Sequence, residues 1–66
     1  MKTKEWYMSR VQELSFEELK AAITESVMDK ALKKTFSGFI AAYEQERDPG
    51  DLQLIQERFA GWLIKT

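Results

Sequence analysis

The sequence predicts an all-α protein, built as a compact antiparallel bundle of three or four short helices. Apolar residues recur at the three- and four-residue spacing of a helix almost throughout the 66-residue chain. No run of strand length alternates apolar and polar residues. The strongest break in the helical pattern is RDPGD, residues 47–51, which contains the single proline of the chain. We therefore expect one helical domain over residues 1–66.

The first two helices are predicted at about residues 3–13 and 16–27. Thr3 is a suitable N-cap for the first helix. At the start of the second, Ser15 can accept a hydrogen bond from the amide of Glu18, and the Glu18 side chain can reach back to the Ser15 amide. This reciprocal pattern is a capping box. It separates the two helices without glycine or proline.

Residues 16–46 leave two arrangements open. On one continuous helix, the apolar stripe within residues 16–27 and the stripe within residues 28–43 would lie about half a turn apart. The chain can break near residues 27–30, with Asp29 capping a third helix at about 29–46, so that both stripes face one interior. Alternatively, the helix is continuous and a second copy of the chain covers the outward stripe, which would make a homodimer. We favour the break, because short turns between antiparallel helices are common in bundles.

The last helix is expected at about residues 49–64. Asp48 suits its N-cap position, and Pro49 suits the first helical position. We expect the core to draw one apolar stripe from each helix. These residues are Tyr7, Val11, Leu14, Phe16, Leu19, Ile23, Val27, Leu32, Phe36, Phe39, Ile40, Leu52, Ile55, Phe59 and Leu63.

The composition argues against several classes of site. The chain has no cysteine and no histidine, so disulfides, the usual zinc, haem and iron–sulfur ligands, and the usual catalytic base and thiolate are all missing. We therefore expect no enzymatic activity, no metal site and no cofactor. No segment could span a bilayer or serve as a signal peptide, so we expect a cytoplasmic protein without a membrane partner.

The function we expect is that of a small non-enzymatic interaction module, a regulator, inhibitor or adaptor of bacterial or phage type. Such a protein would bury a helix face against a partner protein, and acidic residues such as Glu44, Glu46 and Asp48 would steer the encounter. Apolar and small residues outside the core stripes are the candidate contacts. They are Trp6, Met8, Gly38, Ala41, Ala42 and Leu54.

Two glycines inside helical segments support a contact surface of this kind. A glycine costs a helix about 1 kcal/mol relative to alanine. Gly38 and Gly61 therefore suggest that some backbone approaches closely there, unless they mark a bend or a helix end.

The alternative function is that of a small nucleic-acid-associated regulator. Its phosphate contacts would be the basic cluster Lys20, Lys30, Lys33 and Lys34. The chain carries ten basic and eleven acidic residues, a net charge of −1, which favours the interpretation of these lysines as a solvated helix face.

Overall fold

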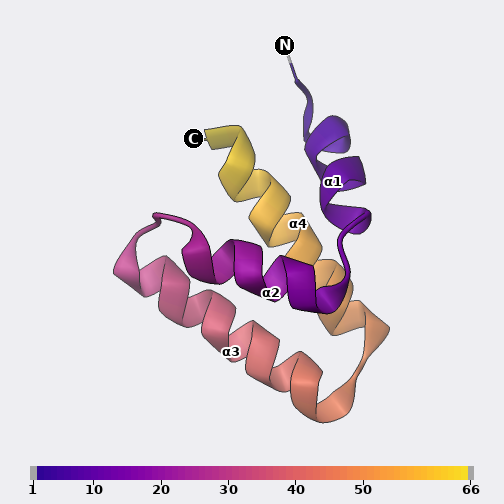
Figure 1. The fold of residues 1–66 in the computed structure, drawn as a ribbon, viewed down its shortest axis with the longest axis vertical. Helices are drawn as coiled ribbons and strands as arrows, with labels where there is room; N and C mark the ends of the chain where they lie inside the picture. Colours follow the sequence, from indigo (N-terminus) through magenta and orange to yellow (C-terminus); the bar gives the residue numbers. More distant parts are fainter. Residues whose placement is uncertain (1, 66) are drawn as a thin grey trace.

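The computed structural model describes residues 2–65, and it is an all-α bundle, as predicted (Figure 1). Its helices are α1 (Lys4–Gln12), α2 (Phe16–Glu25), α3 (Lys30–Glu46) and α4 (Pro49–Lys65). No strand occurs within the described range.

Helix α4 is the central element of the bundle. It packs against α1, α3 and α2, whereas the other contacts between helices are chiefly those of α2 with α3. In Figure 1, α4 passes behind α2, with α1 on one side and α3 on the other. Each of the other helices therefore covers part of the surface of α4.

The first two helix starts follow the predicted cap chemistry. The hydroxyl of Thr3 accepts a hydrogen bond from the Trp6 amide at 3.2 Å. The Ser15 hydroxyl accepts from the Glu18 amide at 3.2 Å, and a Glu18 carboxylate oxygen accepts from the Ser15 amide at 2.8 Å. The capping box that separates α1 from α2 is therefore confirmed.

The chain breaks between α2 and α3, which confirms the arrangement that we favoured. Ser26 leaves the helical conformation with φ −70° and ψ 140°, and its hydroxyl donates a hydrogen bond to the Ala22 carbonyl at 2.6 Å. Asp29 then caps α3, with its carboxylate accepting from the Ala31 amide at 3.1 Å.

This break makes one core prediction wrong. Val27 lies in the turn and is 96% exposed. The apolar spacing of α2 extends to Val27 in the sequence, but the helix ends at Glu25, so the side chain of Val27 no longer follows the stripe.

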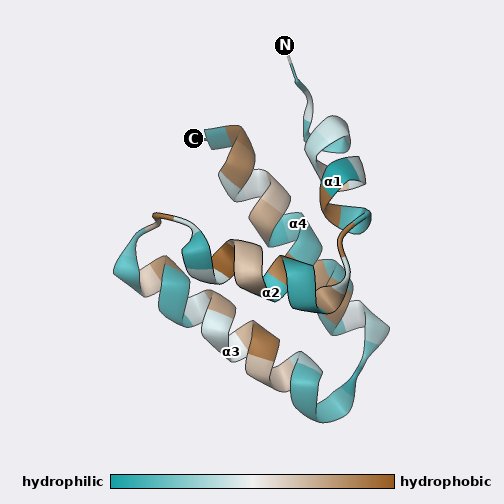
Figure 2. Ribbon diagram, in the orientation of Figure 1, coloured by the Kyte–Doolittle hydropathy of each residue, from teal (hydrophilic) through white to brown (hydrophobic). Residues whose placement is uncertain are grey.

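The turn from α3 to α4 reverses the chain within two residues. Arg47 adopts the left-handed conformation, with φ 56°, and its amide donates to the Tyr43 carbonyl at 2.7 Å. The Asp48 carboxylate accepts from the Gly50 amide at 2.9 Å, as expected of the residue that precedes Pro49. In Figure 2 this connection is hydrophilic, whereas hydrophobic residues are spread along the helices.

The core joins residues from all four helices. Its buried members are Val11, Phe16, Leu19, Ile23, Phe36, Ile40, Ile55, Phe59 and Ala60. Of these, Ala60 is the one that we did not predict. The other predicted core residues pack against this cluster as half-buried side chains: Tyr7, Leu14, Leu32, Phe39, Leu52 and Leu63. The rings of Phe36 and Phe59 meet edge to face, with centroids 6.2 Å apart, and join α3 to α4.

Candidate protein-interaction site

One side of α4 is left open by the other helices. Ile55, Phe59 and Ala60 face the interior and are almost fully buried. Residues on the opposite side, at positions 54, 57, 58, 61 and 65, remain half-buried or exposed. This set, which we call the open side of α4, follows the three- and four-residue spacing of a single helical stripe.

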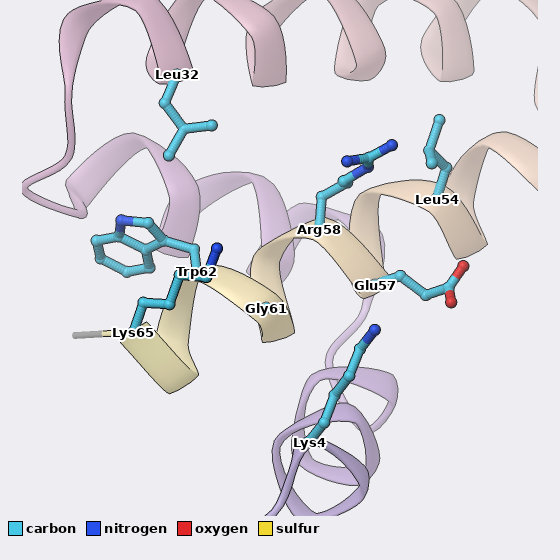
Figure 3. A pocket seen from close by; sticks show the side chains of 8 residues that line it. All are labelled: Lys4, Leu32, Leu54, Glu57, Arg58, Gly61, Trp62 and Lys65. Carbon is cyan, nitrogen blue, oxygen red and sulfur yellow. The ribbon is translucent and has the colours of Figure 1, made fainter.

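The open side of α4 lies in a hollow of about 430 Å³ (Figure 3). Leu32 points toward α4 from α3, and Lys4 points toward it from α1 on the other side. Between them lie residues of α4: Leu54, Glu57, Arg58, Gly61, Trp62 and Lys65. The hollow therefore has aliphatic and aromatic side chains together with charged ones.

A second hollow, of about 240 Å³, adjoins the first along the α3–α4 contact. It shares Leu32 and Arg58 with the larger hollow, and Thr35, Phe36 and Phe39 complete it. We call this smaller hollow the α3–α4 groove. Trp62 is fixed beside it, because its ring stacks on Phe59 with centroids 5.7 Å apart and planes 10° apart.

Gly61 lies on the open side of α4, where a side chain at its position would contact no other part of the described chain. A Cβ built at Gly61 would meet no described atom within 4 Å, apart from the backbone of its own helix and its chain neighbours, and the same holds for Gly38. Within residues 2–65, no backbone from another part of the chain therefore approaches closely at either position, and close approach by the backbone of a partner stays a prediction. Neither glycine ends or interrupts its helix, because Gly61 lies within α4 and Gly38 lies within α3. Space above Gly61 thus remains free for a group from another molecule.

Positive charge predominates around the hollow. Lys4, Arg58 and Lys65 line it with a single carboxylate, that of Glu57. Within residues 2–65 the ion pairs are Arg10–Glu13 at 3.4 Å and Lys20–Glu44 at 2.6 Å, so none of the three lining cations has an ionic partner there.

The predicted partner-binding residues are spread over three helices. Leu54 lines the larger hollow, and it is the one member of the set that lines either hollow. Trp6 is 39% exposed on α1, where Lys2 lies over its ring at 4.5 Å and Arg10 at 5.3 Å. Met8 packs against the core as a half-buried side chain.

The three small residues of α3 form no part of the hollow. Gly38 and Ala41 are exposed, and Ala42 is half-buried. Because none of them lines either hollow, they share no surface with Leu54 there.

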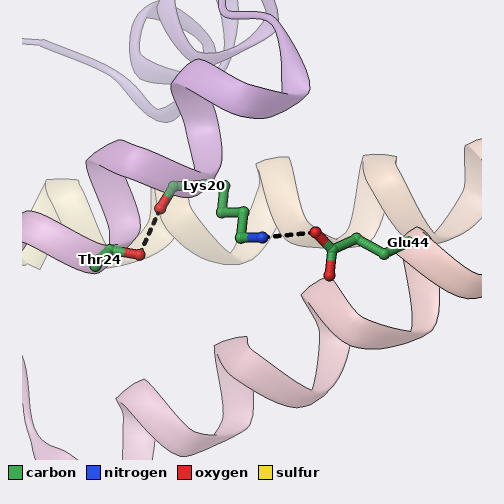
Figure 4. A network of polar contacts seen from close by, with 3 residues as sticks. All are labelled: Lys20, Thr24 and Glu44. Atoms are coloured by element: carbon green, nitrogen blue, oxygen red, sulfur yellow. Dashed lines mark hydrogen bonds and ion pairs between the residues drawn. The ribbon is translucent and has the colours of Figure 1, made fainter.

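Two of the four lysines proposed for nucleic acid have partners within the chain. The Lys20 ammonium donates to a Glu44 carboxylate oxygen at 2.6 Å and joins α2 to α3 (Figure 4). Lys33 donates to the Thr24 carbonyl at 2.5 Å, at the end of α2. Lys30 and Lys34 remain exposed on α3 without a hydrogen bond or ion pair to residues 2–65.

Within residues 2–65, no group of three or more acidic side chains converges to hold an ion. In the same range, no helix combines the length and the apolar composition needed to cross a bilayer.

Comparison with protein-family models, curated proteins and solved structures found no match for this chain.

Most residues of the hollow were missed by the sequence analysis. Arg58, Gly61 and Lys65 share the stripe of Leu54, and this spacing is visible in the sequence. The sequence could not show that α1 and α3 leave this stripe open, nor that Lys4 and Leu32 lie at its margins. Those facts depend on the tertiary arrangement.

Proposed function

We propose that this chain is a small non-enzymatic regulator, inhibitor or adaptor, and that it acts in the cytoplasm by binding a partner protein through the open side of α4. The observation that carries the proposal is the hollow along α4, where Leu32, Leu54 and Trp62 are accessible beside cations that have no ionic partner among residues 2–65. Accessible apolar side chains with a polar margin are typical of protein-binding surfaces.

The chemistry of the hollow supports binding over catalysis. It offers one carboxylate, Glu57, so it lacks the pair of carboxylates that general acid–base catalysis without histidine would commonly use. The hollow is not enclosed, so water would compete with any catalytic hydrogen bond there.

Site-specific photo-cross-linking in the cells that naturally produce the protein tests this proposal. A benzophenone amino acid would replace Leu54 in the hollow, and in a matched control it would replace Glu17, an exposed residue of α2. We expect a discrete protein adduct from position 54, absent from position 17, that an excess of untagged chain suppresses. Equal adducts from both positions, or none from position 54, would contradict the proposal.

A further inference from the structure

We propose that the open side of α4 and the adjoining α3–α4 groove receive an acidic amphipathic helix of the partner protein. This inference rests on the proposed function and adds to it the chemistry of the segment that binds.

The first argument is charge complementarity. Lys4, Arg58 and Lys65 contribute three positive charges to the hollow, and Glu57 contributes one negative charge, a net of 3 − 1 = +2. The whole chain has a net charge of −1, so the rest of the molecule carries −3. Positive charge is thus concentrated on this face, and a segment that bears carboxylates would be attracted to it and oriented by it. Glu44, Glu46 and Asp48, which we expected to steer the encounter, do not line the hollow.

The second argument is shape. Leu54 and Lys65 are eleven residues apart on one helix, which places them about 16 Å apart along the axis of α4. An accessible stripe of this length accommodates about three turns of a second helix. Gly61 lies near its middle, and without a side chain it allows the partner's backbone to approach more closely than a larger residue would.

The apolar contacts complete the fit. Leu54 and Leu32 lie on either side of Arg58, and Trp62 lies at the far end of the hollow. An amphipathic helix with apolar residues three and four positions apart would place them between these side chains. Its acidic residues would then lie close to Arg58 and Lys65, which belong to α4, and to Lys4, which belongs to α1.

Two other occupants fit less well. A symmetric pair of copies would bring this face, with its net charge of +2, against itself, and like charges would oppose the contact. Nucleic acid would find cations, but Phe59 already stacks on one face of Trp62, and Leu32 and Leu54 have no planar surface on which a base could stack.

The test uses the intrinsic fluorescence of Trp62 in the full chain. The chain has two tryptophans, so Trp6→Phe leaves Trp62 as the sole reporter. The first probe is a lactam-bridged synthetic helix of about four turns, with leucines spaced three and four residues apart and glutamates beside them. The second probe is the same peptide with glutamines in place of the glutamates.

We expect the glutamate peptide to change the Trp62 emission saturably and to bind about tenfold more tightly than the glutamine peptide, as roughly three exposed charge pairs would allow. Arg58→Glu leaves two cations against two carboxylates on this face, so the preference should fall to within about twofold. Lys34→Glu changes the net charge of the chain equally but lies outside both hollows, and it should leave the preference intact.

Gly61→Leu provides an uncharged variant. Its side chain would enter space that no described atom occupies, so we expect the fold to persist and both peptides to lose binding. Should this variant fail to fold, the comparison of Arg58→Glu with Lys34→Glu still decides the question.

Equal binding of the two peptides, or binding of neither, would overturn the inference. So would a short DNA duplex that perturbs Trp62 more strongly than the glutamate peptide, or a concentration-dependent Trp62 signal from the chain alone. If position 54 cross-links to a protein while the peptides fail, the interaction function stands and the acidic helix is wrong. If cross-linking fails as well, both proposals fall.

Discussion

Val11 and Val27 are the same residue type in opposite environments. Val11 is 2% exposed in the core, between α1 and the rest of the bundle, whereas Val27 is 96% exposed in the turn from α2 to α3. Both were predicted to be buried, because both continue an apolar stripe in the sequence. The difference arises because α2 ends before Val27, and the geometry of a helical stripe applies only within the helix.

The same substitution at both valines should therefore have different effects. Val11→Ala removes buried methyl groups and leaves a cavity, so we expect the free energy of unfolding to fall by about 2 kcal/mol. Val27→Ala should change it by less than about 0.5 kcal/mol. Urea denaturation followed by circular dichroism would measure both. Similar losses at the two positions would mean that Val27 is covered in solution.

At the level of single elements, the helix starts were the most predictable features of the molecule. Three helices begin where the sequence indicated a start. The starts are marked by the Ser15–Glu18 capping box, by the Asp29 cap, and by Asp48 followed by Pro49. These signals are local, since each involves residues two or three positions apart. They depend little on where the rest of the chain lies, which is why the sequence alone reveals them.

The capping box makes a measurable contribution to stability. Ser15→Ala removes the acceptor for the Glu18 amide, so we expect the free energy of unfolding to fall by about 1 kcal/mol.

Ser37→Ala is the matched control, because Ser37 is exposed within α3 and alanine favours a helix interior slightly more than serine does. We expect no loss of stability for this variant in the same denaturation experiment. A Ser15 variant as stable as the Ser37 variant would show that the cap is dispensable.

For the whole molecule, the central position of α4 links the fold to the candidate site. The interior side of α4 supplies Ile55, Phe59 and Ala60 to the core, and its open side supplies most of the hollow. A chain of this length buries only about 60% of its unfolded surface, so its stability is small and the interior side tolerates little change. The open side can be altered with a much smaller effect on folding.

The break after α2 also bears on the state of association. A homodimer was required only if one continuous helix left the second apolar stripe outside. In the bundle, Phe36 is 1% and Ile40 is 7% exposed, so that stripe is already covered.

We therefore expect a monomer of 7.7 kDa in light scattering after gel filtration, with a mass independent of protein concentration. Arg58→Glu is a useful comparison, because it removes the excess positive charge that would oppose pairing through the open side of α4. A mass near twice the monomer value for the unmodified chain would contradict this expectation.

The candidate site was much less predictable than the fold. Leu54 was identified because it lies off the core stripe of its helix, and that is information within one element. Lys4 of α1 and Leu32 of α3 also line the hollow, although they precede Leu54 by 50 and 22 residues in the sequence. No local pattern indicates that these residues meet. Trp6 and Gly38 satisfied the same local criterion as Leu54, yet they lie outside both hollows.

The turn at Val27 offers a place to attach a probe. Ser26 and Asp29 fix the helix ends on either side of it through their own side chains, whereas the valine side chain is almost wholly in solvent and lines neither hollow. A cysteine introduced there would be the sole thiol of the chain and could carry a dye or an immobilising linker. Such a label would leave the helix caps and the surface of α4 chemically unmodified.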